Sequence, residues 1–311
     1  MSFAGARATS VSVVASAPGR LLLSGASPGP RLSVALDRRA LCRVETGGAD
    51  VVIESKDTLT KTAAADIAEL LARAPASFVA HVLDLLGVTE GVRVATEWKL
   101  PVGSGVDGDS ALALAAAAAV ARAFGRESGP DEIVRLAREA GKRAGRVEDH
   151  GHHAALWGGV VLTRGAGEGL VARALDLDPG RIDEALLLVD AGDAGAQDAV
   201  PGSKASSGPA ADVTERLVEA LLAGRYDDVV GLVADETESA PPGGPGARRV
   251  VDTVREAGGA ARPLPQGRLV AVWAPPGARG PGRGEAVREA LKAAGLKPLP
   301  VRVDLRGLEL D

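Results

Sequence analysis

Apolar and polar residues alternate in short runs at the start of the chain, a pattern typical of β-strands rather than helices. It predicts strands over residues 11–15, 21–24, 33–36, 40–45 and 51–54. The Ala-Pro-Gly sequence at 17–19 is expected to separate the first two strands, because proline removes a backbone donor and glycine weakens a strand. The Leu-Asp-Arg-Arg sequence at 36–39 lies between the next two.

Apolar residues take a helical spacing after this segment. Helices are predicted over residues 66–73 and 76–86, and a strand over 91–96. A glycine-rich loop at 103–110 opens into an alanine-rich stretch at 111–124 that is apolar on nearly every face, which predicts a buried helix. A helix at 131–143 follows, with Pro130 just before its start.

The second half combines further strands and helices. Strands are predicted over 158–163, 185–189, 269–273 and 299–304, and helices over 211–223, 227–233, 249–257 and 284–294. A Pro/Gly-rich stretch at 238–248 predicts a loop. The helix–strand–helix–strand order at the end is that of half a ferredoxin-like domain. We expect a domain boundary near residue 165, giving domains at 1–165 and 166–311.

Composition narrows the class of protein. The chain has 311 residues, of which 46% are hydrophobic and 25% charged, as in soluble globular proteins. Aromatic residues make up only 2% and the net charge is −5, which argues against a nucleic-acid partner. The single cysteine, Cys42, excludes a disulfide within the chain and fits a cytoplasmic protein. The longest apolar stretch, 111–120, is too short for the roughly 20 residues of a membrane span, so no membrane partner is expected.

Three segments resemble those of one enzyme family. Residues 16–25 read SAPGRLLLSG and 34–39 read VALDRR; residues 100–106 read LPVGSGV before SALA at 110–113; the third segment runs from Gly145 to the pair Gly158-Gly159. In this order they resemble the A-P-G-K and A-V-D-R-R strands, the P-x-G-x-G-L-G-S-S-A phosphate loop and the G-x-P-S-G-x-D…G-G stretch of the GHMP kinases. Mevalonate and phosphomevalonate kinases are the most similar members.

The resemblance implies an α+β, two-domain GHMP-kinase-like fold, with a ribosomal-S5-like N-terminal domain and a ferredoxin-like C-terminal domain. It also implies a loop that holds ATP phosphates on backbone N–H groups and a helix N-terminus. That loop comprises Gly103, Ser104, Gly105, Asp107, Gly108, Asp109 and Ser110. A substrate pocket is implied at Ser24, His150, His152 and His153.

The same segments depart from the family pattern. Asp107 stands where the family has glycine, and Gly108 and Asp109 stand where it has two serines. A carboxylate beside a phosphate is unfavourable, although Asp109 is also a suitable ligand for Mg²⁺. The family's glutamate-containing G-E segment is missing after Gly25, and two prolines interrupt the residues at 261–267 that correspond to its C-terminal glycine loop.

The catalytic residues depart as well. The family's catalytic aspartate falls at Gly151, which has no side chain, so Asp149 is the nearest substitute. The lysine that pairs with this aspartate is replaced by Arg20, which keeps the charge but cannot donate a proton at neutral pH. Arg20 and Asp149 are therefore the candidate catalytic residues, and the losses together favour a non-catalytic relative.

Three of the four histidines lie together at 150, 152 and 153. His150 and His152, with a neighbouring carboxylate, form a candidate Zn²⁺-type site, since imidazole and carboxylate both bind this ion. The alternative is a polar helix start with partly solvated imidazoles.

Three functions follow. The first is a non-catalytic, kinase-derived protein with a binding or regulatory role toward a small metabolite or a protein partner. The second is an active ATP-dependent kinase for mevalonate, phosphomevalonate or a sugar. The third is a metal-binding protein. No cofactor is certain, and ATP and Mg²⁺ are expected only if the chain is active.

Overall fold

The larger of the two β-sheets consists mainly of strands from the first part of the chain. The computed structural model describes residues 10–25, 29–100, 104–145, 151–166, 169–192, 210–238, 244–264, 268–275 and 283–311. Within them, an eight-stranded sheet has the order β12-β1-β2-β5-β3-β4, and β6 and β7 extend it from β2. Its strands are β1 (Ser12–Gly25), β2 (Arg31–Thr46), β3 (Val51–Ser55), β4 (Thr60–Ala64), β5 (Val92–Trp98), β6 (Val160–Arg164), β7 (Val171–Leu175) and β12 (Glu309–Leu310).

Helices pack against this sheet and enclose the first core. They are α1 (Ile67–Arg73), α2 (Phe78–Leu85), α3 (Gly108–Ala123), α4 (Pro130–Arg143) and α5 (His152–Trp157). Helix α3 lies at the centre, where its residues from Ser110 to Ala121 are all buried. Alanine favours helix formation, and its small side chain lets α3 lie close to β1 and β2.

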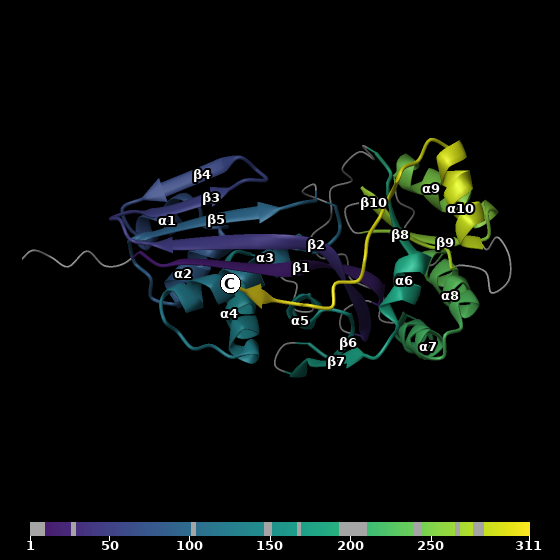
Figure 1. Cartoon of the computed structure of the whole chain (residues 1–311), viewed down its shortest axis with the longest axis horizontal. Coiled ribbons are helices and arrows are strands. Elements are labelled where there is room, and N and C mark those ends of the chain that lie inside the picture. Colours follow the sequence, from purple (N-terminus) through teal and green to yellow (C-terminus); the bar gives the residue numbers. More distant parts are fainter. Residues whose placement is uncertain are drawn as a thin grey trace, which may run out of the picture.

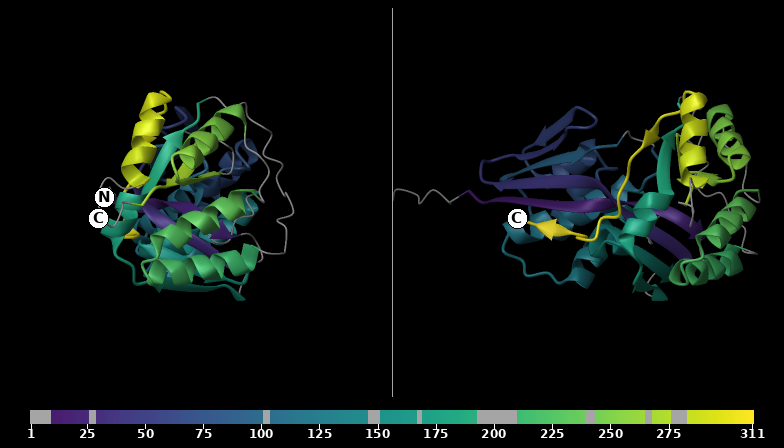
Figure 2. Two further views of the ribbon diagram at one scale, coloured as in Figure 1. Left: turned by 90° about the vertical axis from the view of Figure 1, so that its right-hand side faces the viewer. Right: turned by 45° about the vertical axis from the view of Figure 1, so that its right-hand side comes forward.

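The second sheet is smaller and antiparallel. Its order is β11-β8-β10-β9, formed by β8 (Leu186–Asp190), β9 (Ala260–Pro263), β10 (Leu269–Trp273) and β11 (Pro298–Leu299). Its helices are α6 (Pro179–Ala185), α7 (Ala210–Leu222), α8 (Tyr226–Glu238), α9 (Pro245–Glu256) and α10 (Arg283–Ala293). Figures 1 and 2 show this α+β unit at the opposite end of an elongated molecule from α1 and α2.

One hydrophobic cluster and the C-terminal segment of the chain connect the two sheets. Leu21 and Leu32 of the long β1–β2 pair belong to the same hydrophobic cluster as Leu188 and Trp273 of the second sheet. After α10 the chain runs back to the first sheet, where β12 pairs with β1 (Figure 1). The returning segment is held by Arg39, whose Nη1 lies 2.6 Å from Asp304 Oδ2.

Most predicted elements are confirmed, with boundaries shifted by a few residues. The predicted break at 17–19 was wrong, because β1 runs through Pro18 and Gly19, which pair with Arg39 and Leu36 of β2. The predicted break at 36–39 was also wrong, because β2 continues through these residues, with Asp37 and Arg38 forming a bulge that has no partner in β1. The predicted strand at 299–304 is limited to Pro298–Leu299, because the following residues cross between the two sheets.

Several short elements were missed, namely β4, β7, β9, β12 and α6, and α5 was expected only in the polar-helix interpretation of the histidines. Strands β6 and β7 lie on either side of residue 165 and pair with each other in the first sheet. This pairing does not mark a domain boundary, so the boundary near residue 165 stays a prediction. No helix in the described parts of the chain has both the length and the apolar character that a membrane span requires. Cys42 is buried as predicted, and burial raises the pKa of its thiol to about 12.

Candidate functional site

The start of helix α3 is the point where most of the predicted site residues meet. Ser104 is buried just before the helix, and Gly105 has a φ of +78°, a conformation that glycine adopts without strain. Gly108 begins the helix beneath Trp98, whose ring would overlap a side chain at that position. Gly103, the first residue of the predicted loop, lies outside the described residues. The loop therefore leads directly to the N-terminus of a buried helix, the kind of position at which proteins bind anions.

The anion at this helix start is Asp107. Its Oδ1 accepts a hydrogen bond from the backbone N–H of Ser110 at 3.0 Å, which makes it the helix N-cap. The Ser110 hydroxyl donates to the other carboxylate oxygen, Oδ2, at 2.7 Å. A negative charge here is also favoured by the helix dipole. The carboxylate thus makes with this helix start the kind of interactions that a bound anion would make.

Arg20 of β1 forms an ion pair with this carboxylate. Its Nε and Nη2 donate to Asp107 Oδ2 at 3.1 and 2.9 Å, and its Nη1 donates to Ser33 Oγ at 3.4 Å. The backbone fixes the pair, because Asp107 N–H donates to the Arg20 carbonyl at 2.9 Å. The side chains are only 5% and 14% exposed. Burial by itself raises the pKa of Asp107, but Arg20 and the hydrogen bonds from Ser110 outweigh it and hold that pKa below its ordinary value.

Gly151, which the resemblance aligns with the family's catalytic aspartate, lies against the same carboxylate. A Cβ atom at residue 151 would overlap Asp107 Oδ2 and would lie 2.5 Å from Ser110 Oγ. Asp107 therefore fills the space into which a side chain at 151 would project. The chain lacks a carboxylate at 151 but holds one in the adjoining space, supplied by another loop and facing the arginine that replaces the family's lysine. The predicted substitute, Asp149, lies outside the described residues.

The histidines that follow Gly151 lie on α5. His152 is 4% exposed and its Nδ1 has no hydrogen-bond partner. Burial, together with Arg20, lowers the pKa of His152 to about 4, and Asp107 only partly opposes this shift. His153 packs edge-on against Trp157 with ring centroids 5.3 Å apart. The buried His152 is therefore not the partly solvated side chain that the polar-helix interpretation expected, whereas the half-buried His153 agrees with it.

The remaining predicted residues are placed as follows. Within the described residues no group of three His, Cys, Asp or Glu side chains is arranged to hold a metal ion, and His150 lies outside them. Asp109, the predicted Mg²⁺ ligand, is exposed in the first turn of α3. Ser24 is buried, and its hydroxyl lies 2.9 Å from that of Thr214 on α7. Residues 261–263 of the predicted C-terminal loop belong to β9, whereas 265–267 lie outside the described residues.

Sequence reasoning identified Arg20 and Asp107 separately but missed their pairing. The sequence also showed two departures from the family pattern, a carboxylate gained at position 107 and a carboxylate lost at position 151. Two opposite changes of this kind are the signal that could have indicated that the two positions are neighbours in space.

Part of the N-terminal region that contains α3 is similar to a known family. Residues 69–159 match the model of the GHMP kinases N terminal domain. No curated protein matches the chain.

Solved structures match nearly the whole chain. A D-glycero-D-manno-heptose 1-phosphate kinase from Bacteriodes thetaiotaomicron has 18% identity and a TM-score of 0.76, with 96% of this chain and 98% of that chain covered. The mevalonate kinase of Methanococcus jannaschii has 14% identity and a TM-score of 0.69, with coverages of 97% and 99%. A homoserine kinase from Cytophaga hutchinsonii has 18% identity and a TM-score of 0.68, with coverages of 96% and 97%.

The predicted two-domain fold is thus confirmed along the whole chain, and the matched N-terminal region carries α3 and the Arg20 partner Asp107. Residues 69–159 are therefore similar to the GHMP kinases N terminal domain, and the chain as a whole has the fold of these solved kinases.

Proposed function

We propose that this protein is a non-catalytic member of the GHMP kinase superfamily, with a binding or regulatory role instead of phosphoryl transfer. The observation that carries the proposal is the carboxylate of Asp107 at the start of α3, bonded to Ser110 and paired with Arg20. In this arrangement the protein's own side chain satisfies the groups on which a phosphate would depend.

Electrostatics support the exclusion of a triphosphate. A phosphate oxygen about 4 Å from the Asp107 carboxylate costs on the order of 4 kcal/mol at an effective dielectric constant near 20. Half of that cost weakens binding by more than about tenfold. Arg20 cannot compensate, because both of the nitrogens nearest Asp107 already donate to it. The residues at this helix start therefore do not fit a bound ATP–Mg²⁺, and we derive no catalytic step through it.

Proton transfer is poorly supported as well. A general base works best with a pKa near the working pH. Arg20 and Ser110 hold the pKa of Asp107 below its ordinary value, and burial lowers the pKa of His152 to about 4. Neither group is a strong base at neutral pH.

One observation favours a second candidate, an active small-molecule kinase for mevalonate, phosphomevalonate or a sugar. Asp107 fills the space beside Gly151 and faces a cation, as the aspartate and lysine of the resembling kinases do. In that case Asp107 would orient the substrate hydroxyl, and activity would depend on its negative charge.

Thermal unfolding with ATP–Mg²⁺ tests nucleotide exclusion. We expect no rise in Tm for the wild type, whereas a ligand at about a hundred times its Kd adds about 2.7 kcal/mol of stability. Asp107→Asn keeps an N-cap side chain and frees Arg20, so we expect this variant to gain a response to ATP–Mg²⁺ or to inorganic triphosphate. Asp109→Asn, the same charge change in the exposed first turn, is the matched control and should gain none.

A phosphoryl-transfer assay separates the two candidates. Wild type is incubated with ATP–Mg²⁺ and mevalonate, phosphomevalonate, homoserine or a heptose phosphate. No transfer is expected. Turnover that disappears in Asp107→Asn would overturn the proposal and establish the kinase. Nucleotide binding by the wild type without turnover would remove the exclusion argument on which the proposal rests.

A further inference from the structure

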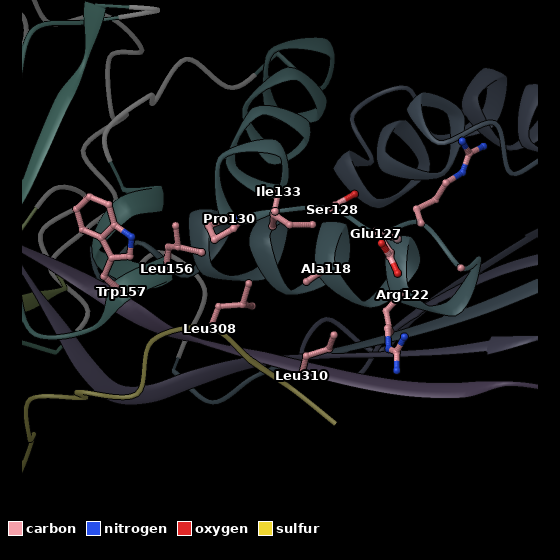
Figure 3. Close-up of a pocket in the computed structure, with 14 residues that line it drawn as sticks. Ala118, Arg122, Glu127, Ser128, Pro130, Ile133, Leu156, Trp157, Leu308 and Leu310 are labelled. Carbon is pink, nitrogen blue, oxygen red and sulfur yellow. The ribbon is translucent and has the colours of Figure 1, made fainter.

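A groove lies at the other end of helix α3, on the side where the C-terminal segment returns to the first sheet. It is lined by the last two turns of α3, the start of α4, the end of α5 and the leucines beside β12, with a volume of about 710 Å³ (Figure 3). We propose that this groove binds an amphipathic carboxylate, with its apolar chain along the floor and its charge at Arg122. This site goes beyond the proposed function, since it involves none of the residues at the start of α3.

The floor of the groove is apolar over most of its length. Ala118 of α3 and Ile133 of α4 are buried at its base. Leu308 and Leu310 form the wall opposite, and Leu310 is 44% exposed. Because alanines on α3 leave space that larger side chains would fill, an apolar chain can lie against the helix. Covering such exposed apolar surface is favourable by roughly 25 cal/mol per Å².

Trp157 closes one end of the groove. It is 40% exposed, whereas Trp273 is fully buried and Trp98 packs against both large cores. Tryptophan is enriched at binding surfaces, where it combines a large apolar ring with one polar atom. Figure 3 shows Trp157 at one end of the row of labelled side chains and Arg122 at the other, with the leucines between them. The groove therefore has an apolar end and a charged end.

The charged end has a net positive charge. Arg122 is exposed and makes no ion pair or hydrogen bond with any described residue. Arg126 donates only to the backbone carbonyl of Leu86, at 3.3 Å, among the residues described. Among the described residues that line the groove, Glu127 is the one carboxylate, so two guanidinium groups outnumber a single negative charge. The chain as a whole carries a net charge of −5, which makes this excess of arginine local.

The dimensions favour a small ligand over a protein segment. Ligand pockets commonly have volumes of about 300–1,000 Å³, apolar linings and a few polar groups that fix orientation. Arginine is suited to a carboxylate, because its planar group forms two parallel hydrogen bonds with it. An apolar chain ending in a carboxylate matches both ends of the groove.

Tryptophan fluorescence with decanoate as the probe, below its critical micelle concentration, tests the proposal. We expect a saturable blue shift that is absent in Trp157→Phe, because the ligand covers this exposed ring. Decanol, which has the same chain without the charge, is expected to bind at least about tenfold more weakly, since a hydrogen bond to a charged group contributes about 1.5–3 kcal/mol. Acetate, which has the charge without the chain, should give no shift.

Two exposed substitutions complete the test without disturbing the core. Arg122→Gln should weaken decanoate binding at least about tenfold and leave decanol unchanged, whereas Arg135→Gln, the same change on α4 outside the groove, should leave both unchanged. Leu310→Glu should abolish decanoate binding by placing a negative charge in the wall, and Val171→Glu on exposed β7 is its control. A wild type without a Trp157-dependent shift, or equal binding of decanoate by wild type and Arg122→Gln, would overturn the proposal.

Discussion

The two ends of helix α3 are built in opposite ways. At its start, Asp107 caps the helix, accepts from Ser110 and pairs with Arg20, so that charges and hydrogen-bonding groups are matched within a nearly closed space. At its far end, Arg122 is exposed without a partner among the described residues, and Trp157 leaves much of its ring in solvent. We call the start of α3 its satisfied end, because its charged groups have partners, and the far end its unsatisfied end, because Arg122 and Trp157 are exposed to solvent.

The contrast suggests a physical reason for expecting ligand binding at the far end of α3 instead of at its start. A helix N-terminus attracts anions because its N–H groups and dipole are unsatisfied. Here an internal carboxylate removes that attraction, while unpaired cations and uncovered apolar surface remain at the opposite end. The position of a site within a fold therefore does not establish its function, because one side chain from a neighbouring loop can occupy it.

The largest expected effect is the loss of the ion pair at the satisfied end. Asp107→Ala leaves the guanidinium of Arg20 buried without its partner and removes the helix cap. Breaking a buried pair in this way costs about 3–5 kcal/mol, so we expect a loss of that size in the free energy of unfolding, measured with urea. The matched control is the pair of Arg164 and Glu215, which lies 2.6 Å apart but is 49% and 41% exposed. Glu215→Ala should cost about 1 kcal/mol or less.

Replacing both partners sharpens this result. The double variant Arg20→Met with Asp107→Leu removes the uncompensated charge, so we expect it to be more stable than Asp107→Ala alone. If Asp107→Ala were no more costly than Glu215→Ala, the start of α3 would not be the tightly satisfied end described above.

The next effect is the pH dependence that His152 confers beside the ion pair. Burial lowers its pKa to about 4 in the folded protein, from an ordinary value of 6.5, with smaller lowering contributions from Arg20, His153 and Arg138 and an opposing one from Asp107. The unfolded chain therefore binds a proton between pH 6.5 and 4 that the folded protein does not, and stability falls as the pH falls through this window. The shift corresponds to about 3 kcal/mol at most.

Urea unfolding between pH 7 and 4 measures this loss. His152→Gln is neutral throughout the range, so we expect a flatter profile than that of the wild type. Gly129→Ala, which changes no titratable group, is the control and should keep the wild-type profile. Identical profiles for wild type and His152→Gln would contradict the burial of a neutral imidazole at this site. Below pH 4 the lowered pKa of Asp107 predicts a further loss of stability as its carboxylate becomes protonated.

A somewhat smaller effect is expected from the crowding between residues 107 and 151. Gly151→Ala places a Cβ atom against Asp107 Oδ2 and Ser110, and overpacking of this kind costs about 1–3 kcal/mol. Gly129→Ala is the matched control, because a Cβ atom there meets no other atom within 4 Å.

The exchange variant tests whether the carboxylate can move between the two positions. Asp107→Gly with Gly151→Asp restores the arrangement of the resembling kinases, and we expect it to be more stable than the sum of the two single variants predicts. Strict additivity in urea unfolding would show that the two positions do not share the same space.

The parts of the fold that the sequence predicted are those with strong local patterns. The apolar run of α3 and the five apolar residues of β10 each indicated a buried element. Strand β4, in contrast, reads Thr-Lys-Thr-Ala-Ala and is mostly exposed, so only its pairing with β3 makes it a strand. Helix α5 has six residues and lacks a side-chain cap, so its packing against α3 and β1 stabilises it.

The candidate site was predictable as a region but not as an arrangement. Family motifs identified the loop before α3 and the substitutions within it. The pairing of Asp107 with Arg20 joins residues 87 positions apart, and its geometry depends on the register of β1 against the loop. The groove had no sequence signal, because Trp157 and Leu310 come to line the same groove only when the C-terminal segment returns to the first sheet.

The smallest expected effect is at the unsatisfied end of α3. Arg122→Ala removes an exposed side chain without a partner in the described structure, so the only stabilising interaction lost is that with the helix dipole, about 0.3–1 kcal/mol at low salt. Alanine's higher helix propensity offsets part of this loss, and we expect a net change within about 0.5 kcal/mol in urea unfolding. Raising the salt concentration should reduce the difference further, because exposed charges are screened. A loss comparable to that of Asp107→Ala would mean that Arg122 is held by the fold. A near-neutral result would leave its charge available for a ligand, since the native structure does not depend on it.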